Sequence, residues 1–487
     1  MHPAAVGRSL GLLLLCLAGA LLVPAAAAVA LGSPDLAAFL LSAAATAGAG
    51  LILILACPGP HDLSGRDGFA VVALAWASFA AFGALPYWFA GTFPSYTDAF
   101  FEAMSGFTTT GATVLTDIEI QPPGILLWRS FTQWLGGMGI IVLSLAVLPA
   151  LGVGAAHLFR AEVPGPTHDR LVPRVRETAK LLWLVYVILS AAEVLLLQLG
   201  GMSLLEAVHH TFTTMATGGF SVKNASIAAY PRPFLQWVIV VFMFIAGANF
   251  LLHFHALRGN LFSYWRDPEF RFYTAVILTG TALAAWATGG GDRGLEATLR
   301  DAAFTVVSIL TTTGYVTADY ERWPAFAQLL LLLLMFVGGC AGSTGGAMKN
   351  VRVLLLFKNA HRELHKLVHP KAVRLVRLGG RVVPEEVLQS VQAFALFYVL
   401  LFVLAAAAMT ALGFDLVSAA GAVATTLGNV GPGLGSVGPT DHYAAVPLLG
   451  KWILAACMLV GRLELYTVLV LFLPDFWEGF GGPAQGR

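Results

Sequence analysis

Four short segments rich in threonine and glycine recur along the chain, each between two long apolar stretches. This repetition restricts the possible folds more than any other feature. The segments are SGFTTTG at 105–111, TMATGGF at 214–220, LTTTGY at 310–315 and LGNVGPG at 427–433. Their spacing of roughly 95–120 residues indicates one structural unit used four times. A unit made of a span, a short re-entrant helix, a Gly-rich loop and a second span can line an ion pore with backbone carbonyls.

The composition places most of the chain in a membrane. Of the 487 residues, 57% are hydrophobic and only 11% are charged, whereas about 25% charged residues is usual in soluble domains. The net charge of +1 favours no nucleic-acid partner. The sequence shows no nucleophile–base constellation, phosphate-binding loop or redox motif, so we predict that the protein is not an enzyme.

The lengths of the apolar runs separate spans from re-entrant segments, because about 20 residues cross a bilayer and runs of about 10–14 residues do not. The predicted spans are near 10–31, 36–56, 69–93, 124–150, 179–200, 233–257, 270–288, 323–357, 387–413 and 446–473. The predicted re-entrant pore helices are Tyr96–Phe107, Ser203–Met215, Leu295–Leu310 and Asp415–Thr426. The first run could instead be a secretory signal, but its close hairpin partner favours two retained helices.

An acidic residue stands near the start of each predicted pore helix, which suits the positive end of a helix dipole. In three units it lies 13 residues before the loop glycine: Asp98 before Gly111, Glu206 before Gly219 and Asp301 before Gly314. In the fourth unit Asp415 lies 13 residues before Gly428 but 16 before Gly431. The spacing alone therefore leaves the fourth loop glycine open.

Basic residues predict the orientation. Eighteen of the 28 lysines and arginines lie in the linkers between units, among them Arg160 and Arg170, and nine of these 18 fall within 349–381. The positive-inside rule assigns these linkers to the cytoplasm. Ten spans with both termini inside follow, and the Thr/Gly loops then enter from the outer face.

The Thr/Gly loops are the candidate selectivity filter. Four loops around one axis can replace the water around an alkali cation with carbonyl oxygens, and turning successive carbonyls toward an axis favours glycine. The alternative, that small residues only let helices pack closely, does not explain the recurrence. The assigned residues are Thr109, Thr110, Gly111, Thr217, Gly218, Gly219, Thr312, Thr313, Gly314, Asn429, Val430 and Gly431.

A glycine-rich break predicts a gate. The run Trp323–Phe357 has 35 residues and would be roughly 50 Å long as one helix, against a core of about 30 Å. Unwound backbone at that depth must line a cavity or be buried in protein. We predict a gating loop beneath the filter, with a simple kink as the alternative. Its residues are Gly338, Gly339, Gly342, Ser343, Thr344, Gly345 and Gly346.

Arg462 lies deep in the last predicted span, where an unpaired charge is costly. Glu464, two residues away, points elsewhere on a helix and is a poor local partner. We predict that Arg462 faces the pore below the filter and contacts the gating loop; an ion pair with another helix is the alternative. Gln133 is predicted to serve packing. His361, His365 and His369 could bind a metal, but a solvated amphipathic helix is favoured.

These segments resemble the TrkH/TrkG-type membrane subunit of bacterial Trk potassium-uptake systems, within the Trk/Ktr/HKT superfamily of cation transporters. The resemblance runs from about residue 36 to residue 478. It is carried by GFTTTGATVL at 106–115, RSFTQWLGGMGII at 129–141, RAEVPGP at 160–166, TGGFS at 217–221, GGCAGSTGG at 338–346, GNVGPGLG at 428–435 and GRLELYT at 461–467.

The resemblance implies an all-α polytopic membrane protein in which four pseudo-symmetric helix–pore-loop–helix units surround a central pore, after two N-terminal helices. The expected parts are the N-terminal helices at 1–60 and pore units at 61–157, 158–258, 259–360 and 361–487, the last beginning with a basic linker. The resemblance selects Gly431 over Gly428. It also implies that the family's gating loop and pore arginine match the glycine-rich loop and Arg462.

The resemblance further implies K⁺ as the transported ion, with no tightly bound cofactor. In the superfamily, serine in place of the first filter glycine accompanies sodium permeation, and Gly111 is glycine here. The implied setting is the bacterial inner membrane. The implied partners are a second copy and a cytosolic nucleotide-binding subunit of the TrkA type. A Na⁺- or H⁺-coupled potassium symporter is the alternative, although only Glu193 and Glu464 are acids clearly within spans.

Overall fold

The computed structural model describes residues 2–58, 64–146, 171–289 and 294–477. The RAEVPGP segment, Arg160, Arg170 and the predicted boundaries near residues 60 and 157 lie outside these ranges. Within them the chain is a mostly helical, polytopic membrane protein. Its strands there are β1 (Arg377–Leu378) and β2 (Arg381–Val382), which form one short antiparallel hairpin.

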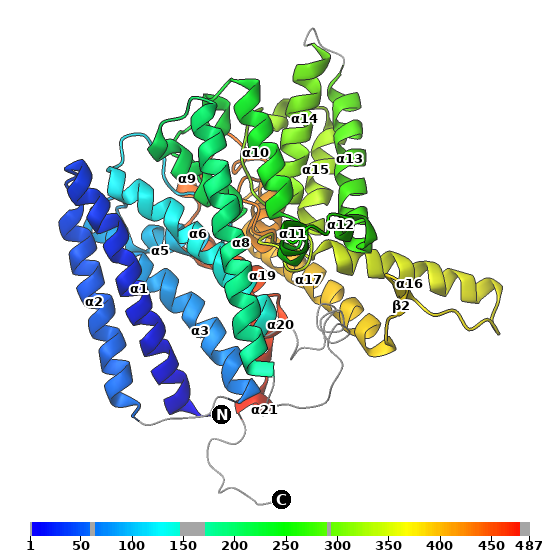
Figure 1. Cartoon of the computed structure of the whole chain (residues 1–487), viewed down its shortest axis with the longest axis horizontal. Coiled ribbons are helices and arrows are strands. Elements are labelled where there is room, and N and C mark those ends of the chain that lie inside the picture. Colours follow the sequence, from blue (N-terminus) through cyan, green and yellow to red (C-terminus); the bar gives the residue numbers. More distant parts are fainter. Residues whose placement is uncertain (1, 59–63, 147–170, 290–293, 478–487) are drawn as a thin grey trace, which may run out of the picture.

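The first two helices, α1 (Pro3–Leu31) and α2 (Leu36–Ala56), form a hairpin at one edge of the molecule (Figure 1). Their backbones approach closely, because a Cβ on Gly11 would lie 2.7 Å from the Gly50 carbonyl oxygen. Small residues permit such contact between membrane helices. In the turn that joins them, the buried Asp35 accepts a 2.8 Å hydrogen bond from the Ile125 N–H of the first pore unit.

The rest of the chain repeats one pattern four times. The first unit holds α3 (Gly65–Gly83), α4 (Leu85–Phe89), α5 (Tyr96–Phe107) and α6 (Pro123–Ala146); the second holds α8 (Leu171–Leu199), α9 (Leu204–Met215), α10 (Pro233–Ala246) and α11 (Phe250–Leu257). The third holds α12 (Phe262–Arg266), α13 (Pro268–Thr288), α14 (Leu295–Leu310), α15 (Ala325–Val337) and α16 (Asn350–Val368). The fourth holds α17 (Glu385–Ala411), α18 (Leu416–Gly428), α19 (Leu448–Arg462), α20 (Tyr466–Leu469) and α21 (Pro474–Trp477).

The pore helices α5, α9, α14 and α18 agree with the predicted segments to within two residues at either end. Ser95, Ser203 and Asp415 cap three of them by accepting backbone N–H bonds of the first turn. Hydrogen bonds from Ser418 lower the pKa of the Asp415 carboxyl, which keeps that cap ionised. For α14 the spacing selected the wrong acid. This helix begins at Leu295, so Asp301 lies in its second turn and Glu296 occupies the first.

Six helices of the described residues are long and apolar enough to cross a membrane: Pro3–Leu31, Leu36–Ala56, Arg66–Phe89, Glu177–Leu199, Pro268–Thr288 and Glu385–Ala411. Two further apolar stretches, predicted as single spans, are bent pairs. The chain turns by 103° between α10 and α11, and by 111° between α19 and the segment Tyr466–Phe472. The prediction of continuous helices at 233–257 and 446–473 is therefore wrong, while the predicted break after α15 is present.

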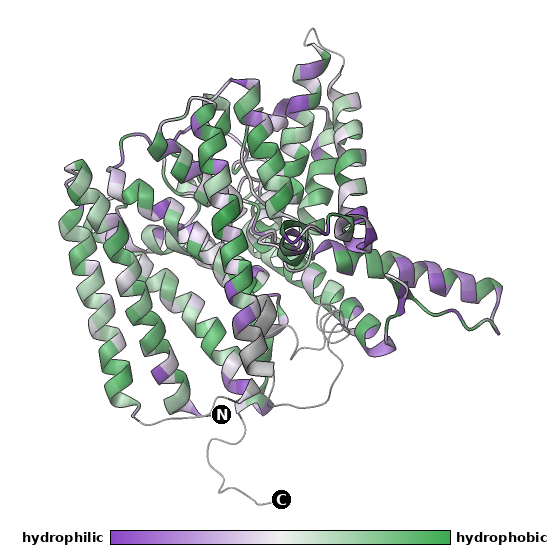
Figure 2. Ribbon diagram, in the orientation of Figure 1, coloured by the Kyte–Doolittle hydropathy of each residue, from purple (hydrophilic) through white to green (hydrophobic). Residues whose placement is uncertain are grey.

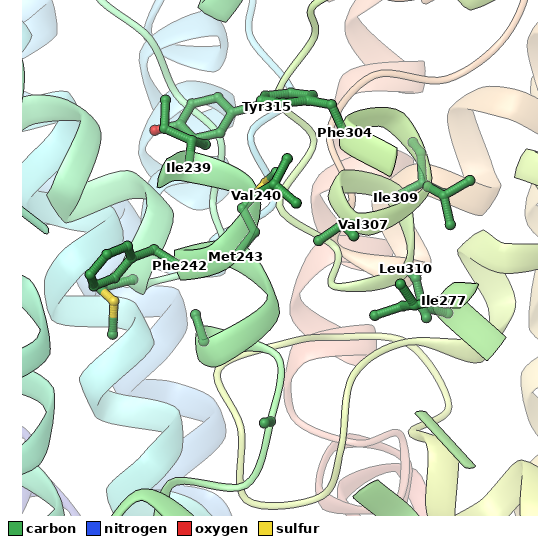
Figure 3. Packing of buried hydrophobic residues seen from close by; sticks show 14 of the residues in the cluster. Ile239, Val240, Phe242, Met243, Ile277, Phe304, Val307, Ile309, Leu310 and Tyr315 are labelled. Carbon is green, nitrogen blue, oxygen red and sulfur yellow. The ribbon is translucent and has the colours of Figure 1, made fainter. Parts of the chain in front are cut away.

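Hydrophobic residues make up most of α1 and α2, whereas α16 projects from the body and carries hydrophilic residues along much of its length (Figures 1 and 2). Inside, α10 contributes Ile239, Val240 and Met243 to one of two buried clusters of equal size (Figure 3). Side chains of α14 such as Val307 and Leu310 complete it. This core holds the second and third pore helices in place.

The two ends of the described chain lie on the same side of the molecule. Val6 of α1, Ala70 of α3 and Phe476 of α21 belong to one buried cluster, and α21 lies beside the N-terminus in Figure 1. An even number of crossings brings both ends to one side, as the predicted topology requires.

Candidate ion-conduction pathway

The four loop glycines form a closed ring. The four loops pack closely against one another. A Cβ added to any of the four glycines would clash with a carbonyl oxygen of the next loop, that of the residue just before its glycine. The order is Gly111 to Gly218, Gly219 to Thr313, Gly314 to Val430 and Gly431 to Thr110. The contacts therefore run from the first loop to the fourth and back to the first, around one axis.

The four loops also share one unusual backbone conformation. The glycines have positive φ values of 83° at Gly111, 73° at Gly219, 81° at Gly314 and 102° at Gly431. Two residues earlier, Thr109, Thr217, Thr312 and Asn429 have positive φ values of 51°, 53°, 61° and 55°. Non-glycine residues rarely adopt this region, so the repetition is a built feature. It places Gly431, not Gly428, in the ring, because Gly428 is the last residue of α18.

The ring opens toward one face. A pocket there is lined by all four ring glycines together with Arg129, Lys223 and Asp441. The twelve predicted filter residues are thus brought together, with the pore helices ending at them. The carbonyls that follow the pore helices lie where the helix C-terminal dipoles favour a cation.

Gln133 supports the second loop. Its side-chain amide donates a 2.7 Å hydrogen bond to the Gly218 carbonyl, and its oxygen accepts a 3.1 Å bond from the Phe220 N–H. The amide therefore spans the filter glycine between them. The sequence analysis assigned Gln133 to packing alone, which is wrong. Its place in the apolar α6 was the available signal, because a buried amide must find partners.

Other polar side chains hold the remaining loops. The Tyr443 hydroxyl donates a 3.0 Å bond to the Gly431 carbonyl, and the Asn429 amide donates a 2.9 Å bond to the Thr110 hydroxyl. In the third loop, Ser308 donates a 2.7 Å bond to the Tyr315 carbonyl. These bonds stiffen loops whose backbone conformation is costly on its own.

A buried ion pair joins the first two loops from behind. Arg129 of α6 donates a 2.6 Å bond to Glu102 of α5 and a 2.9 Å bond to the Ser221 carbonyl after the second loop. Glu102 in turn accepts a 2.9 Å bond from the Val114 N–H after the first loop. The guanidinium also lies 3.9 Å from the centre of the Phe220 ring. Removing either charge would leave the other buried without its partner.

The glycine-rich loop between α15 and α16 lies directly beneath the ring of loop glycines. Thr344 donates a 3.0 Å bond to the Met215 carbonyl at the end of α9, and the Gly346 N–H donates a 2.7 Å bond to the Thr312 hydroxyl. A Cβ on Gly346 would meet the Gly428 carbonyl oxygen at the end of α18. The tip of the loop (residues 343–346) therefore contacts the ends of three pore helices at once.

The break between α10 and α11 provides partners for this loop. The free carbonyl of Gly247 accepts a 2.8 Å bond from the Cys340 N–H, and the Phe250 N–H donates a 3.1 Å bond to the Gly342 carbonyl. Unwound backbone in a membrane needs hydrogen-bond partners. The break at residues 247–250 and the glycine-rich loop supply these partners to each other. The sequence analysis did not anticipate this role for residues 247–250.

Arg462 is 2% exposed at the end of α19, and it donates a 2.6 Å bond to the Thr344 carbonyl. The predicted contact between Arg462 and the loop is therefore present. Glu464 forms an ion pair with Arg352 of α16 instead. The third break, at Glu464 and Leu465 with φ values of 58° and 48°, thus lies against the start of α16.

Glu269, near the start of α13, holds the base of the loop. One of its carboxylate oxygens accepts bonds from the Ala341 N–H at 2.7 Å and the Val351 N–H at 3.0 Å. Val351 is in the first turn of α16, so the carboxylate also faces a helix N-terminus. The Asn350 side chain donates a 2.5 Å bond to the Gly338 carbonyl and closes the neck.

The three histidines of the basic linker lie at the end of one helix. His361 and His365 lie on the amphipathic α16, and His369 follows its end. Within the described ranges no group of three His, Cys, Asp or Glu side chains is arranged to hold a metal ion.

Known proteins share both the sequence and the arrangement of this site. The chain matches the TrkH family, described as cation transport protein, over residues 43–288 and 294–478. It is 45% identical over 98% of its length to the whole Trk system potassium uptake protein TrkH of Salmonella typhimurium. It is 44% identical, with the same coverage, to that of Escherichia coli strain K12.

A solved structure shows the same fold. The crystal structure of the potassium transporter TrkH from Vibrio parahaemolyticus superposes with a TM-score of 0.90 at 38% sequence identity. The match covers 98% of this chain and 100% of that chain. The chain therefore belongs to the TrkH family of cation transport proteins.

Proposed function

We propose that this protein takes up potassium ions across the bacterial inner membrane through a gated, channel-like pore. The observation that carries the proposal is the ring of four loops, in which each glycine packs on a carbonyl of the next loop. Relatives that align along nearly the whole chain are named as potassium uptake proteins, which gives the ion.

The filter residues are the twelve of the ring segments, and K⁺ is the transported ion. Carbonyls fixed by the paired positive φ values replace the hydration shell of a cation. Glycine at position 111 favours potassium. A β-carbon there would meet the Gly218 carbonyl oxygen, so any side chain would disturb the oxygen cage.

The gate consists of the glycine-rich loop, residues 338–346, together with Arg462. The loop tip lies under the ends of three pore helices, and the guanidinium holds its Thr344 carbonyl. A permeating ion must displace both. Opening therefore requires the loop to leave the axis.

A coupled symporter is the second candidate, carried by one residue. Glu193 of α8 is fully buried, and among the residues that the structure describes neither of its carboxylate oxygens has a hydrogen-bond partner. Buried acids in spans often serve proton relays. Glu193→Gln removes the titratable proton, so coupled uptake would be lost in this variant whereas passive conduction would persist.

The partners and topology follow the family. We propose a homodimer that docks a cytosolic nucleotide-binding subunit of the TrkA type on the basic linkers. Both termini are then cytoplasmic. The exposed basic residues of the last linker, such as Lys371 and Arg374, suit an acidic protein surface.

The test is tracer uptake into liposomes that hold this chain alone, with rubidium compared to sodium. Rubidium should enter in preference, with no sodium or proton gradient imposed. Gly111→Ser should raise sodium entry relative to rubidium. An unchanged ratio would remove Gly111 from the filter, and rubidium flux that needs a second ion gradient would favour the symporter.

A further inference from the structure

Lys349 is a buried cation that the proposed function does not use. It directly precedes α16, its side chain is 5% exposed, and its ammonium donates a hydrogen bond to the Gly345 carbonyl. Burying an ammonium is costly unless it is paired. The burial of this ammonium against a neutral carbonyl therefore needs an explanation.

The carboxylates near Lys349 are engaged elsewhere. Glu464 is paired with Arg352, and Glu269 accepts two backbone N–H bonds. Two like charges, Arg352 and Arg462, also act on the ammonium. Its direct hydrogen-bond partner is thus a neutral carbonyl, although two acids and two arginines surround the site.

That carbonyl belongs to the tip of the loop. A Cβ on Gly345 would lie 3.1 Å from the Thr311 carbonyl oxygen, at the end of the third pore helix. The neighbouring carbonyl, of Thr344, is held by Arg462. Two successive carbonyls beneath the filter are therefore each occupied by a cation tethered to the protein.

The backbone at Lys349 is strained. Its φ is 73°, and Ala347 has a φ of 57°, in the region that non-glycine residues rarely adopt. Strain of this kind persists where the surroundings enforce it, and it concentrates in switch regions. The exit of the loop is thus held in a conformation that the chain would leave if its contacts were released.

We propose that Lys349 is a second gating cation, whose ammonium holds the Gly345 carbonyl and so keeps the loop closed on the axis below the filter. With the loop closed, the ammonium takes the place that a K⁺ leaving the filter would take on that carbonyl. Opening transfers the carbonyl to the ion and frees the strained exit of the loop. This inference rests on the proposed function, because it needs a conducting pore.

The experiment compares rubidium flux through liposomes in which the chain is reconstituted without a partner. Lys349→Met keeps the length of the stem and removes the charge, and we expect basal flux to rise about tenfold, which equals about 1.4 kcal/mol in the gating equilibrium. Lys349→Arg keeps the charge and should stay near the wild-type value. Lys366→Met removes a partly exposed charge on the same helix, one that pairs with the neighbouring Glu363; it is the matched control and should change nothing.

Lys349→Gln separates charge from hydrogen bonding and also serves if the Met variant does not fold. Glutamine can still donate to the Gly345 carbonyl but carries no charge, so flux should rise. Wild-type flux in a folded Gln variant would overturn the inference, because a structural hydrogen bond would then suffice. Arg462→Ala separates the two levels of the argument. If it conducts while the Lys349 variants stay closed, only the role of Lys349 fails; if no variant conducts, the proposed pore fails.

Discussion

The filter ring and the loop beneath it solve opposite problems with the same backbone chemistry. In the ring, four units contribute equivalent residues, and each loop repeats the same pair of positive φ values. The lower loop belongs to the third unit alone. It is held by Gly247 of the second unit, Glu269 of the third and Arg462 of the fourth.

Under the proposed function, this difference separates the part that selects ions from the part that opens and closes the pore. A symmetric cage needs four nearly equal contributions, and it is stiffened by side chains such as Gln133 and Tyr443. A gate needs a part that can leave, and the contacts of this loop differ from one another in kind and come from different units. Variants in the two regions should therefore fail in different ways.

The largest effect should come from a β-carbon in the ring. Gly314→Ala would place a methyl group against the Val430 carbonyl oxygen at a φ of 81°, so rubidium uptake should fall to the level of empty liposomes. Gly294→Ala, just before the third pore helix where a Cβ meets open space, should conduct normally. Conduction by folded Gly314→Ala would show that the ring tolerates asymmetry.

The buried pair behind the ring should contribute next. Arg129→Leu leaves Glu102 buried without its partner and should lower the free energy of unfolding by about 3–5 kcal/mol, measured by denaturation in detergent. Replacing both residues with leucine should recover part of the loss. The exposed pair Lys366–Glu363 gives the comparison, since it should contribute less than about 1 kcal/mol.

Gating should respond more mildly at the base of the loop. Glu269→Ala leaves the Ala341 and Val351 N–H groups without an acceptor, at a cost to the closed state of about 1–3 kcal/mol. Basal rubidium flux should rise while the preference for rubidium over sodium stays the same. Glu269→Gln retains an acceptor oxygen and should remain closed. A change of ion preference in Glu269→Ala would mean that filter and gate are not separable.

The smallest effect should come from a pore-helix cap. Ser203 accepts a bond from the Glu206 N–H at the start of α9, and Ser203→Ala should cost about 1 kcal/mol of stability. Melting in detergent would measure it. Ion preference should not change, and a shifted preference would show that the caps position the filter.

The four pore helices and their loops could be predicted from local sequence patterns. Helix bounds such as those of α5 and α14 follow from the apolar pattern and its end signals. Asp301 was taken as the acid near the start of the third pore helix because it matches the repeat spacing, but α14 extends one turn further back than that spacing implies. A repeat spacing shows that a unit recurs, but it does not show that the helix of one unit is longer than the others.

The proposed gate was harder to predict because the residues that shape it lie far apart in the sequence. Gly247 is one glycine in an apolar run, and membrane helices tolerate single glycines. The chain bends there because Cys340, nearly a hundred residues later, uses the freed Gly247 carbonyl. Gln133 belongs to the same class, since its partners lie in another unit.

Helix α16 extends the glycine-rich loop outward as a rigid element. It begins at Asn350, immediately after Lys349 and under the filter, and continues unbroken for 19 residues, about 28 Å at 1.5 Å per residue. Its far half is tied to α17 through Arg362 and Glu385. Under the proposed function, a tilt applied at the outer end of this helix would move the loop at its inner end, so a partner bound to α16 could open the pore without entering it.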